Sequence, residues 1–124
     1  LAEIQNKVGE DTIRSFMLKV HLDPDDKTKV SNYSAGMKQK LGIAQAIMEG
    51  QDIVLLDEPF NALDYQTNND VMEILADLKG QGKTLLMTSH QHGYLEKLCD
   101  HLFLIVDKKL VVFDDEVKRK YFLI

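Results

Sequence analysis

The sequence predicts an α/β fold with a mostly parallel sheet, flanking helices and a terminal antiparallel hairpin. Residues 53–57 and 84–88 are two short apolar runs that end in polar side chains, and a helical pattern separates them. Strands that alternate with helices are typical of parallel sheets. Two further apolar runs, 102–106 and 110–113, are joined by a short link that suggests an antiparallel hairpin, although no glycine supplies the usual positive φ.

Length and composition restrict the class of protein. The 124 residues suffice for one domain at most, and 44% hydrophobic with 28% charged residues is typical of globular proteins. A net charge of −5 without a basic stripe argues against a nucleic-acid partner. Each apolar run is far shorter than the 18 or so residues of a membrane span. The single Cys99 permits no internal disulfide, which fits a reducing compartment.

The first 50 residues are predicted to be mainly helical. Residues 1 to about 22 carry apolar side chains at helical spacing, and Asp23–Asp26 is a turn signal with a proline. A second helix is expected to follow Ser34, which stands where an N-cap would close the first turn. The small residues 34–36 leave the backbone N–H groups of this turn open to an anion, although a capped amphipathic helix alone explains the same pattern.

The run Ile53 to Asp57, followed by Glu58 and Pro59, predicts a strand buried on both faces that ends in two carboxylates. Such a strand delivers its carboxylates to the sheet edge where α/β proteins bind ligands. The simpler alternative is a core strand with a solvated acidic end. Residues 84–88 predict a parallel neighbour ending in Ser89 and His90, so both polar ends are expected at one edge.

Helices are also predicted after each of these two strands. Val71, Ile74, Leu75 and Leu78 mark the buried face of the first. The stretch Lys79–Gly82 is expected to end it, with a glycine available for the left-handed cap. A short helix through Leu95 is expected next, and the tail 114–124 is compatible with a terminal helix.

Four motifs, taken together, resemble the second half of an ABC-type ATPase, the nucleotide-binding domain of ABC transporters. In chain order they match the signature loop, the Walker B strand with its glutamate, the D-loop and the switch histidine. They are Tyr33–Leu41, Ile53–Pro59, Asn61–Asp64 and Thr88–His90. The resemblance implies the C-terminal half of a P-loop NTPase core of the RecA-like, ABC type.

The resemblance implies roles at the strand ends. Asp57 resembles the carboxylate that holds Mg²⁺, usually through water, and Glu58 the residue that orients or deprotonates the attacking water. His90 resembles the histidine that hydrogen-bonds the γ-phosphate and links it to the glutamate.

Two other motifs would serve a dimer of such domains. The signature residues would contact ATP held by the opposing subunit, and Asp64 of the D-loop would couple the two sites, or cap the next helix, or both. These signature residues are Ser34, Ala35, Gly36 and Met37. Tyr33, Ala35 and Met37 depart from the common Leu-Ser-Gly-Gly-Gln, and the Gly-Met-Lys-Gln variant resembles bacterial export ATPases.

The family's phosphate-binding loop, Gly-x-x-x-x-Gly-Lys-Ser/Thr, and its glutamine loop do not occur in the sequence. We therefore expect residues 1–124 to be a partial ABC ATPase domain: residues 1–50 from its helical subdomain and residues 51–124 from its catalytic core. Alone, this segment is expected to be inactive, without tightly bound ATP or Mg²⁺.

The resemblance also implies partners and a location. It predicts an ATP-hydrolysing subunit whose partners are a second nucleotide-binding domain and a membrane-spanning permease. This subunit is expected in the cytoplasm, bound through the permease at the inner face of the membrane. Exposed strand edges would let the segment self-associate. Two alternatives stay open at this point: a non-transport ABC ATPase and a catalytically silent interaction or regulatory module.

Overall fold

The structure is a computed structural model that describes residues 9–62 and 64–122. The chain divides into two compact units, Leu1–His90 and Gln91–Ile124. The predicted site residues all belong to the first unit.

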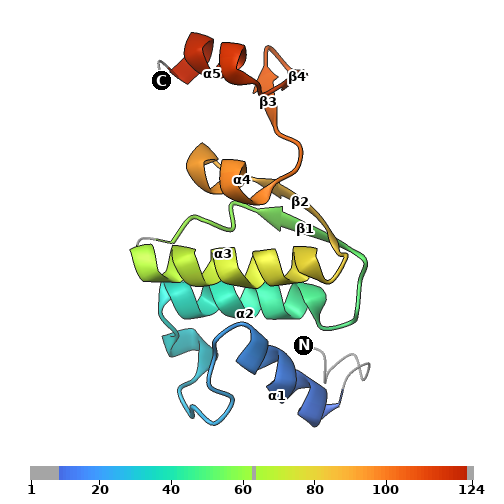
Figure 1. Ribbon diagram of the computed structural model, residues 1–124. Coiled ribbons are helices and arrows are strands. Elements are labelled where there is room, and N and C mark those ends of the chain that lie inside the picture. Colours follow the sequence, from blue (N-terminus) through green and yellow to red (C-terminus); the bar gives the residue numbers. More distant parts are fainter. Residues whose placement is uncertain (1–8, 63, 123–124) are drawn as a thin grey trace. The chain divides into compact units, whose positions relative to one another are not determined.

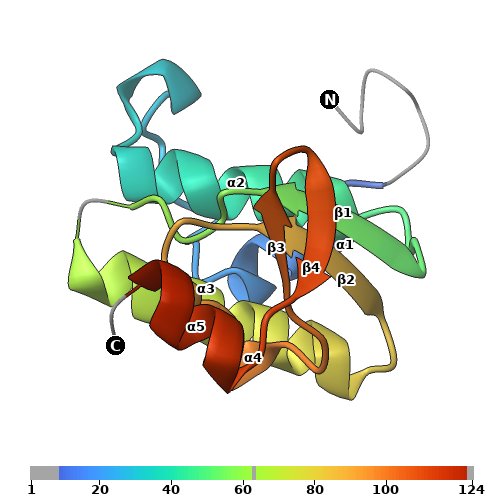
Figure 2. The same cartoon turned by 90° about the horizontal axis from the view of Figure 1, so that it is seen from above.

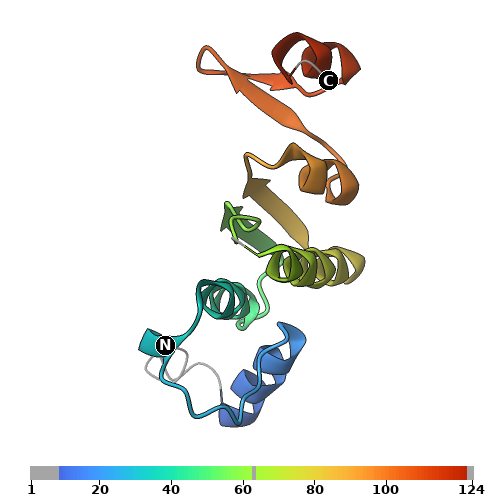
Figure 3. The ribbon, with the colours of Figure 1, turned by 90° about the vertical axis from the view of Figure 1, so that its left-hand side faces the viewer.

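Helices make up most of the first unit. They are α1 (Glu10–Lys19), the short 3₁₀ helix η1 (Val30–Asn32), α2 (Ala35–Ile47) and α3 (Tyr65–Gly80). Figures 1 and 3 show α2 and α3 lying side by side. These two helices supply much of the core, including the following buried residues: Ile43, Ala44, Ile47, Val71, Ile74, Leu75 and Leu78. The four of these in α3 are the ones that the sequence pattern predicted.

The sheet of the first unit has the predicted strands and direction. β1 (Ile53–Asp57) and β2 (Thr84–Thr88) pair in parallel, with α3 as the crossover between them, and the two arrows run alongside each other in Figure 2. Asp57 is the register partner of Thr88. The polar ends of the two strands therefore lie at one edge, as predicted.

The prediction that these strands are buried on both faces is wrong. Val54 is 2% exposed, whereas Leu55 and Leu86, which are register partners, are 69% and 67% exposed. Side chains alternate between the two faces of a strand. Within the described part of this unit, helices cover one face only, so every second apolar side chain faces outward.

The second unit contains α4 (His92–Leu98), the antiparallel pair β3 (Phe103–Val106) and β4 (Lys109–Val112), and α5 (Asp115–Phe122). The predicted hairpin and terminal helix are confirmed. Asp107 and Lys108 adopt φ values of 49° and 65°. These two residues therefore supply the left-handed backbone that glycine usually provides in such a two-residue turn.

Aromatic packing joins the helices of the second unit. The ring of His92 lies 5.0 Å from that of Phe122, which meets Phe113 edge-on at 5.6 Å. Lys118 and Glu96 add an ion pair of 3.0 Å. In the part of the chain that the structure describes, every helix is too short or too polar to span a lipid bilayer.

Candidate active site

Asp57 closes β1 at the polar edge of the sheet. The hydroxyl of Thr88, its register partner, donates a hydrogen bond of 2.6 Å to Asp57 Oδ1. Both residues are exposed, on the face of the sheet that the helices leave open. Asp57 thus presents an oriented carboxylate to solvent, the kind of hard oxygen ligand that Mg²⁺ prefers.

Glu58 follows in a left-handed backbone conformation, with φ of 53°. Its N–H group donates to the carbonyl of Thr88 at 3.1 Å. Its carboxylate points to His90: Oε1 lies 3.2 Å from Nε2, and Oε2 accepts from the His90 N–H at 3.4 Å. The structure thus brings Glu58 and His90 together, although 32 positions separate them in sequence.

The side chains of this pair differ in exposure. Glu58 is 26% exposed, whereas the imidazole of His90 is 96% exposed. An exposed histidine is free to turn toward a ligand, while the glutamate beneath it has fewer positions. The arrangement can hold a water or a phosphate oxygen between an acceptor and a donor.

The loop after Glu58 ends in an N-cap. Asp64 caps α3, with Oδ1 accepting from the Thr67 N–H at 2.7 Å and Oδ2 from the Thr67 hydroxyl at 2.8 Å. These bonds hold the pKa of the Asp64 carboxyl below its usual range. The predicted capping role is confirmed. Leu63, within the predicted D-loop, lies outside the described residues.

Asn68, which the sequence did not single out, fixes the same loop. Its side-chain amide donates to the Ala62 carbonyl at 3.1 Å and accepts from the Ala62 N–H at 3.3 Å. Asn68 is only 5% exposed. The sequence did hold a signal for this role, because Asn68 is a polar residue one helical turn before Val71 on the apolar face predicted for α3.

The predicted N-cap of α2 is confirmed. Ser34 Oγ accepts a 3.1 Å hydrogen bond from the Met37 N–H group. Ser34 and Ala35 are exposed, Met37 is half-buried and Gly36 is buried. A Cβ atom on Gly36 would come within 2.5 Å of Thr67 Oγ1, so glycine allows the first turns of α2 and α3 to meet.

An open groove of about 450 Å³ lies between α2 and β1. It is lined by Ala35, Lys38, Gln39, Gly42, Ile43, Ala46, Leu55, Leu56, Asp57 and Pro59. The signature helix and the acidic end of β1 therefore share one concave surface. Gln39, another residue that the sequence left without a role, lies on its wall.

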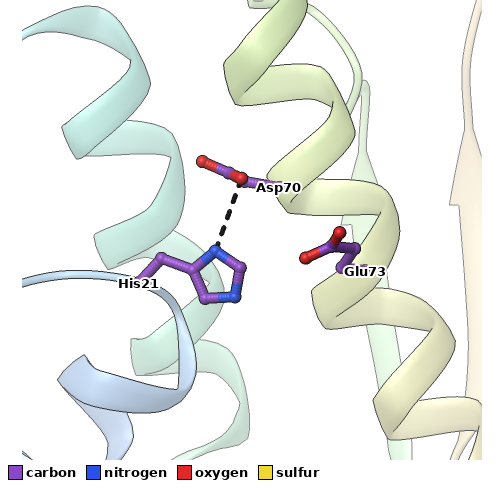
Figure 4. A group of neighbouring side chains, drawn as sticks. All are labelled: His21, Asp70 and Glu73. Atoms are coloured by element: carbon purple, nitrogen blue, oxygen red, sulfur yellow. Dashed lines mark ion pairs between the residues drawn. The ribbon is translucent and has the colours of Figure 1, made fainter.

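Asp70 of α3 is the centre of a second polar cluster, away from the motifs. Lys40 Nζ lies 2.7 Å from Asp70 Oδ2, and the Gln66 amide donates to Oδ1 at 3.0 Å. Figure 4 shows His21 and Glu73 beside it, with His21 Nδ1 at 3.5 Å from Asp70. The hydrogen bond from Lys40 lowers the pKa of the Asp70 carboxyl.

His21, Asp70 and Glu73 can each offer a ligand atom within 4.8 Å of the others. The ammonium group of Lys40, however, already neutralises Asp70, and both of those side chains are largely buried. A cation would have to enter against this positive charge. The cluster is therefore better suited to joining α2 to α3 by an ion pair than to binding a metal.

Replacing Asp70 with Asn is expected to destabilise the chain by about 1–3 kcal/mol at pH 7, because Lys40 loses its charged partner. The pKa of Asp70 is lower in the folded state than in the unfolded state. The stability that Asp70 contributes is therefore fully present above about pH 3.9, the pKa of an unfolded aspartate, and is lost as the pH falls through the folded-state pKa. Urea unfolding at pH 7 and pH 3 should show the difference between wild type and Asp70→Asn shrinking in acid. An equal difference at both pH values would contradict the ion-pair assignment.

The chain is similar to ATP-binding proteins of ABC transporters. A family model described as ABC transporter matches residues 3–61. The uncharacterized ABC transporter ATP-binding protein YybJ of Bacillus subtilis is 42% identical over 100 residues, covering 81% of this chain and 46% of the relative. The lantibiotic transport ATP-binding protein SrtF of Streptococcus pyogenes is 36% identical over 105 residues, covering 85% and 46%.

A solved structure of an ATP-binding cassette of an ABC transporter, in its ADP conformation, has the same fold. It is 19% identical with a TM-score of 0.74, and the match covers 90% of this chain and 46% of that one. The chain spans less than half the length of these curated relatives and of this structure. The predicted fold class and the resemblance to ABC transporter ATP-binding proteins, export types among them, are confirmed.

Proposed function

We propose that this chain, a relative of ABC transporter ATP-binding proteins, forms the C-terminal part of the ATP-hydrolysing subunit of an export-type transporter. The observation that carries the proposal is the pairing of Glu58 with His90 beside Asp57 at one edge of the parallel sheet. Residues 1–50 would belong to the helical subdomain and residues 51–124 to the catalytic core.

Each group at this edge has a separate task in the proposed reaction. Asp57, oriented by Thr88, would hold Mg²⁺ through water, and the ion when bound would neutralise charge on the phosphates of ATP. Glu58 would accept a hydrogen bond from the attacking water and orient it toward the γ-phosphate. His90, exposed and paired with Glu58, would donate a hydrogen bond to that phosphate.

The first turn of α2 would act on a second copy of the domain. Its residues Ser34–Met37 would contact ATP held by the opposing subunit, where the positive end of a helix favours phosphate. Asp64 would couple the two sites. Its cap on α3, together with the contact between Gly36 and Thr67, links the two motifs and supports that assignment.

A permease would be the membrane partner, because the relatives are ATP-binding subunits of transporters. The complete subunit would then lie in the cytoplasm, at the inner face of the membrane. The exposed apolar face of β1 and β2 supports a further proposal, that the isolated chain self-associates.

The isolated chain is expected to bind MgATP far more weakly than micromolar affinity and not to hydrolyse it, since its sequence carries no phosphate-binding loop. Isothermal titration with MgATP measures the first property, and phosphate release measures the second. Micromolar affinity of the isolated chain would contradict the expectation.

The positive control is a completed domain. We define it as this chain joined behind the N-terminal half of an ABC ATPase that carries a Gly-x-x-x-x-Gly-Lys-Ser/Thr loop. The completed domain is expected to release phosphate from ATP in the presence of Mg²⁺. A folded completed domain that binds MgATP but never hydrolyses it would refute the proposed function.

A further inference from the structure

The backbone of Glu58 needs support, because a left-handed conformation is unfavourable for a residue with a Cβ atom. Its φ of 53° costs about 1–2 kcal/mol relative to ordinary backbone. On one side, the Glu58 N–H group donates to Thr88 of β2. The direction of the Glu58 carboxylate also depends on the contacts made by the carbonyl group on the C-terminal side of this residue.

Gln39 of α2 holds that other side. Its Nε2 group donates to the Glu58 carbonyl at 3.2 Å and to the Pro59 carbonyl at 2.6 Å. A side-chain amide nitrogen carries two hydrogens, which match these two consecutive acceptors. Both bonds are partly buried. Loss of the donor would remove this partner from the Pro59 carbonyl in a poorly solvated place, while the Glu58 carbonyl would keep only its 3.2 Å bond from the Asn61 N–H group.

We propose that Gln39 is a positioning residue for Glu58 in ATP hydrolysis. It fixes the peptide groups on the C-terminal side of Glu58, while Thr88 fixes the N-terminal side. The carboxylate is thereby directed at His90 and at the water that it would orient. This inference rests on the proposed function and adds a residue to its machinery.

The same contact gives the site a route for regulation. Gln39 lies on the same helix as the signature residues, one turn after the N-cap Ser34 and the first turn Ala35–Met37. When that turn closes on ATP of the opposing subunit, Gln39 would carry the shift to the backbone of Glu58. Closure of one site would thus adjust the glutamate of the other.

The test compares Gln39→Met with Gln45→Met in the completed domain. Methionine keeps the length of glutamine and removes the donor, and Gln45 is an exposed glutamine of the same helix. We expect Gln39→Met to lower kcat by about 10- to 100-fold, with KM for MgATP changed by less than about twofold, because misplacing a catalytic group by 1 Å costs this much. Gln45→Met should leave both constants at the wild-type values.

A second comparison separates positioning from a merely structural role. If Gln39 acts through Glu58, Gln39→Met should lower single-turnover phosphate release in wild type but not further in a Glu58→Gln background. Gln39→Lys, which restores a donor, should recover most of the lost kcat. Gln39→Glu has the same length but no donor, so it should lower kcat as much as Gln39→Met. It serves as the test variant if Gln39→Met does not fold.

The outcomes distinguish this inference from the proposed function. A completed domain whose hydrolysis does not depend on Glu58 would refute the proposed function itself. Hydrolysis that depends on Glu58, combined with a wild-type kcat in Gln39→Met or with additive losses in the double variant, would overturn the role of Gln39 alone.

Discussion

Replacing Glu58 with Gln in the completed domain is expected to reduce ATP hydrolysis by about 10²- to 10⁴-fold, the range that a general base contributes. Glutamine has the same shape and can still accept from the His90 N–H, so the geometry of the site should persist. What is lost is the negative charge that polarises the attacking water. Phosphate release measures the change in kcat.

Binding should respond differently from hydrolysis. Glu58 is assigned to the water and not to the nucleotide, so the affinity for MgATP, measured by titration, should stay near that of wild type. Glu73→Gln provides a matched control, since Glu73 is an exposed carboxylate of α3 outside the proposed machinery. Turnover in Glu58→Gln as fast as in this control would show that the glutamate is wrongly assigned.

Two glycines of α2 are expected to respond to alanine in opposite directions. In Gly36→Ala the new Cβ would come within 2.5 Å of Thr67 Oγ1, which also donates to the Asp64 cap. Shifting Thr67 would strain this junction and cost about 1–3 kcal/mol. Apart from the backbone of its own helix, nothing lies within 4 Å of the Cβ position of Gly42, so Gly42→Ala should stabilise the chain by about 0.5–1 kcal/mol through helix propensity.

Urea unfolding followed by circular dichroism measures both changes in free energy. The two variants add the same methyl group to the same helix, so their difference isolates the contact with α3. Equal effects of the two substitutions would contradict the close packing of Gly36 on Thr67. A loss of stability in Gly36→Ala alone would also show that Gly36 has a packing role that is independent of ATP.

Features that depend on residues close together in sequence were predictable. Ser34 and Asp64 each cap a helix through a backbone N–H three positions later, and such bonds follow from residue type and spacing. The strands 53–57 and 84–88 were predicted with their observed bounds, because each apolar run ends sharply in polar residues. Parallel pairing then put the polar ends of the two strands at one edge, whereas the register that sets Asp57 beside Thr88 came from the structure.

The exposure of the sheet could not be predicted in the same way. An apolar run shows that a strand can be buried on both faces, but not how many layers of the chain cover it. In the structure the face with Val54 is covered and the face with Leu55 is open. That difference depends on where the helices pack, which no local pattern records.

The sequence by itself determined the order of the motifs, the strands and caps that carry them, and the resemblance to ABC ATPases. The resemblance implied a link between Glu58 and His90, but only the tertiary structure decided its geometry, a 3.2 Å contact made from a left-handed backbone. It also decided that Gln39 bonds the Glu58 carbonyl and that Lys40 pairs with Asp70. The physical reason is the distance along the chain. These contacts join residues 19 to 32 positions apart, so they exist only after α2, α3 and the two strands have packed.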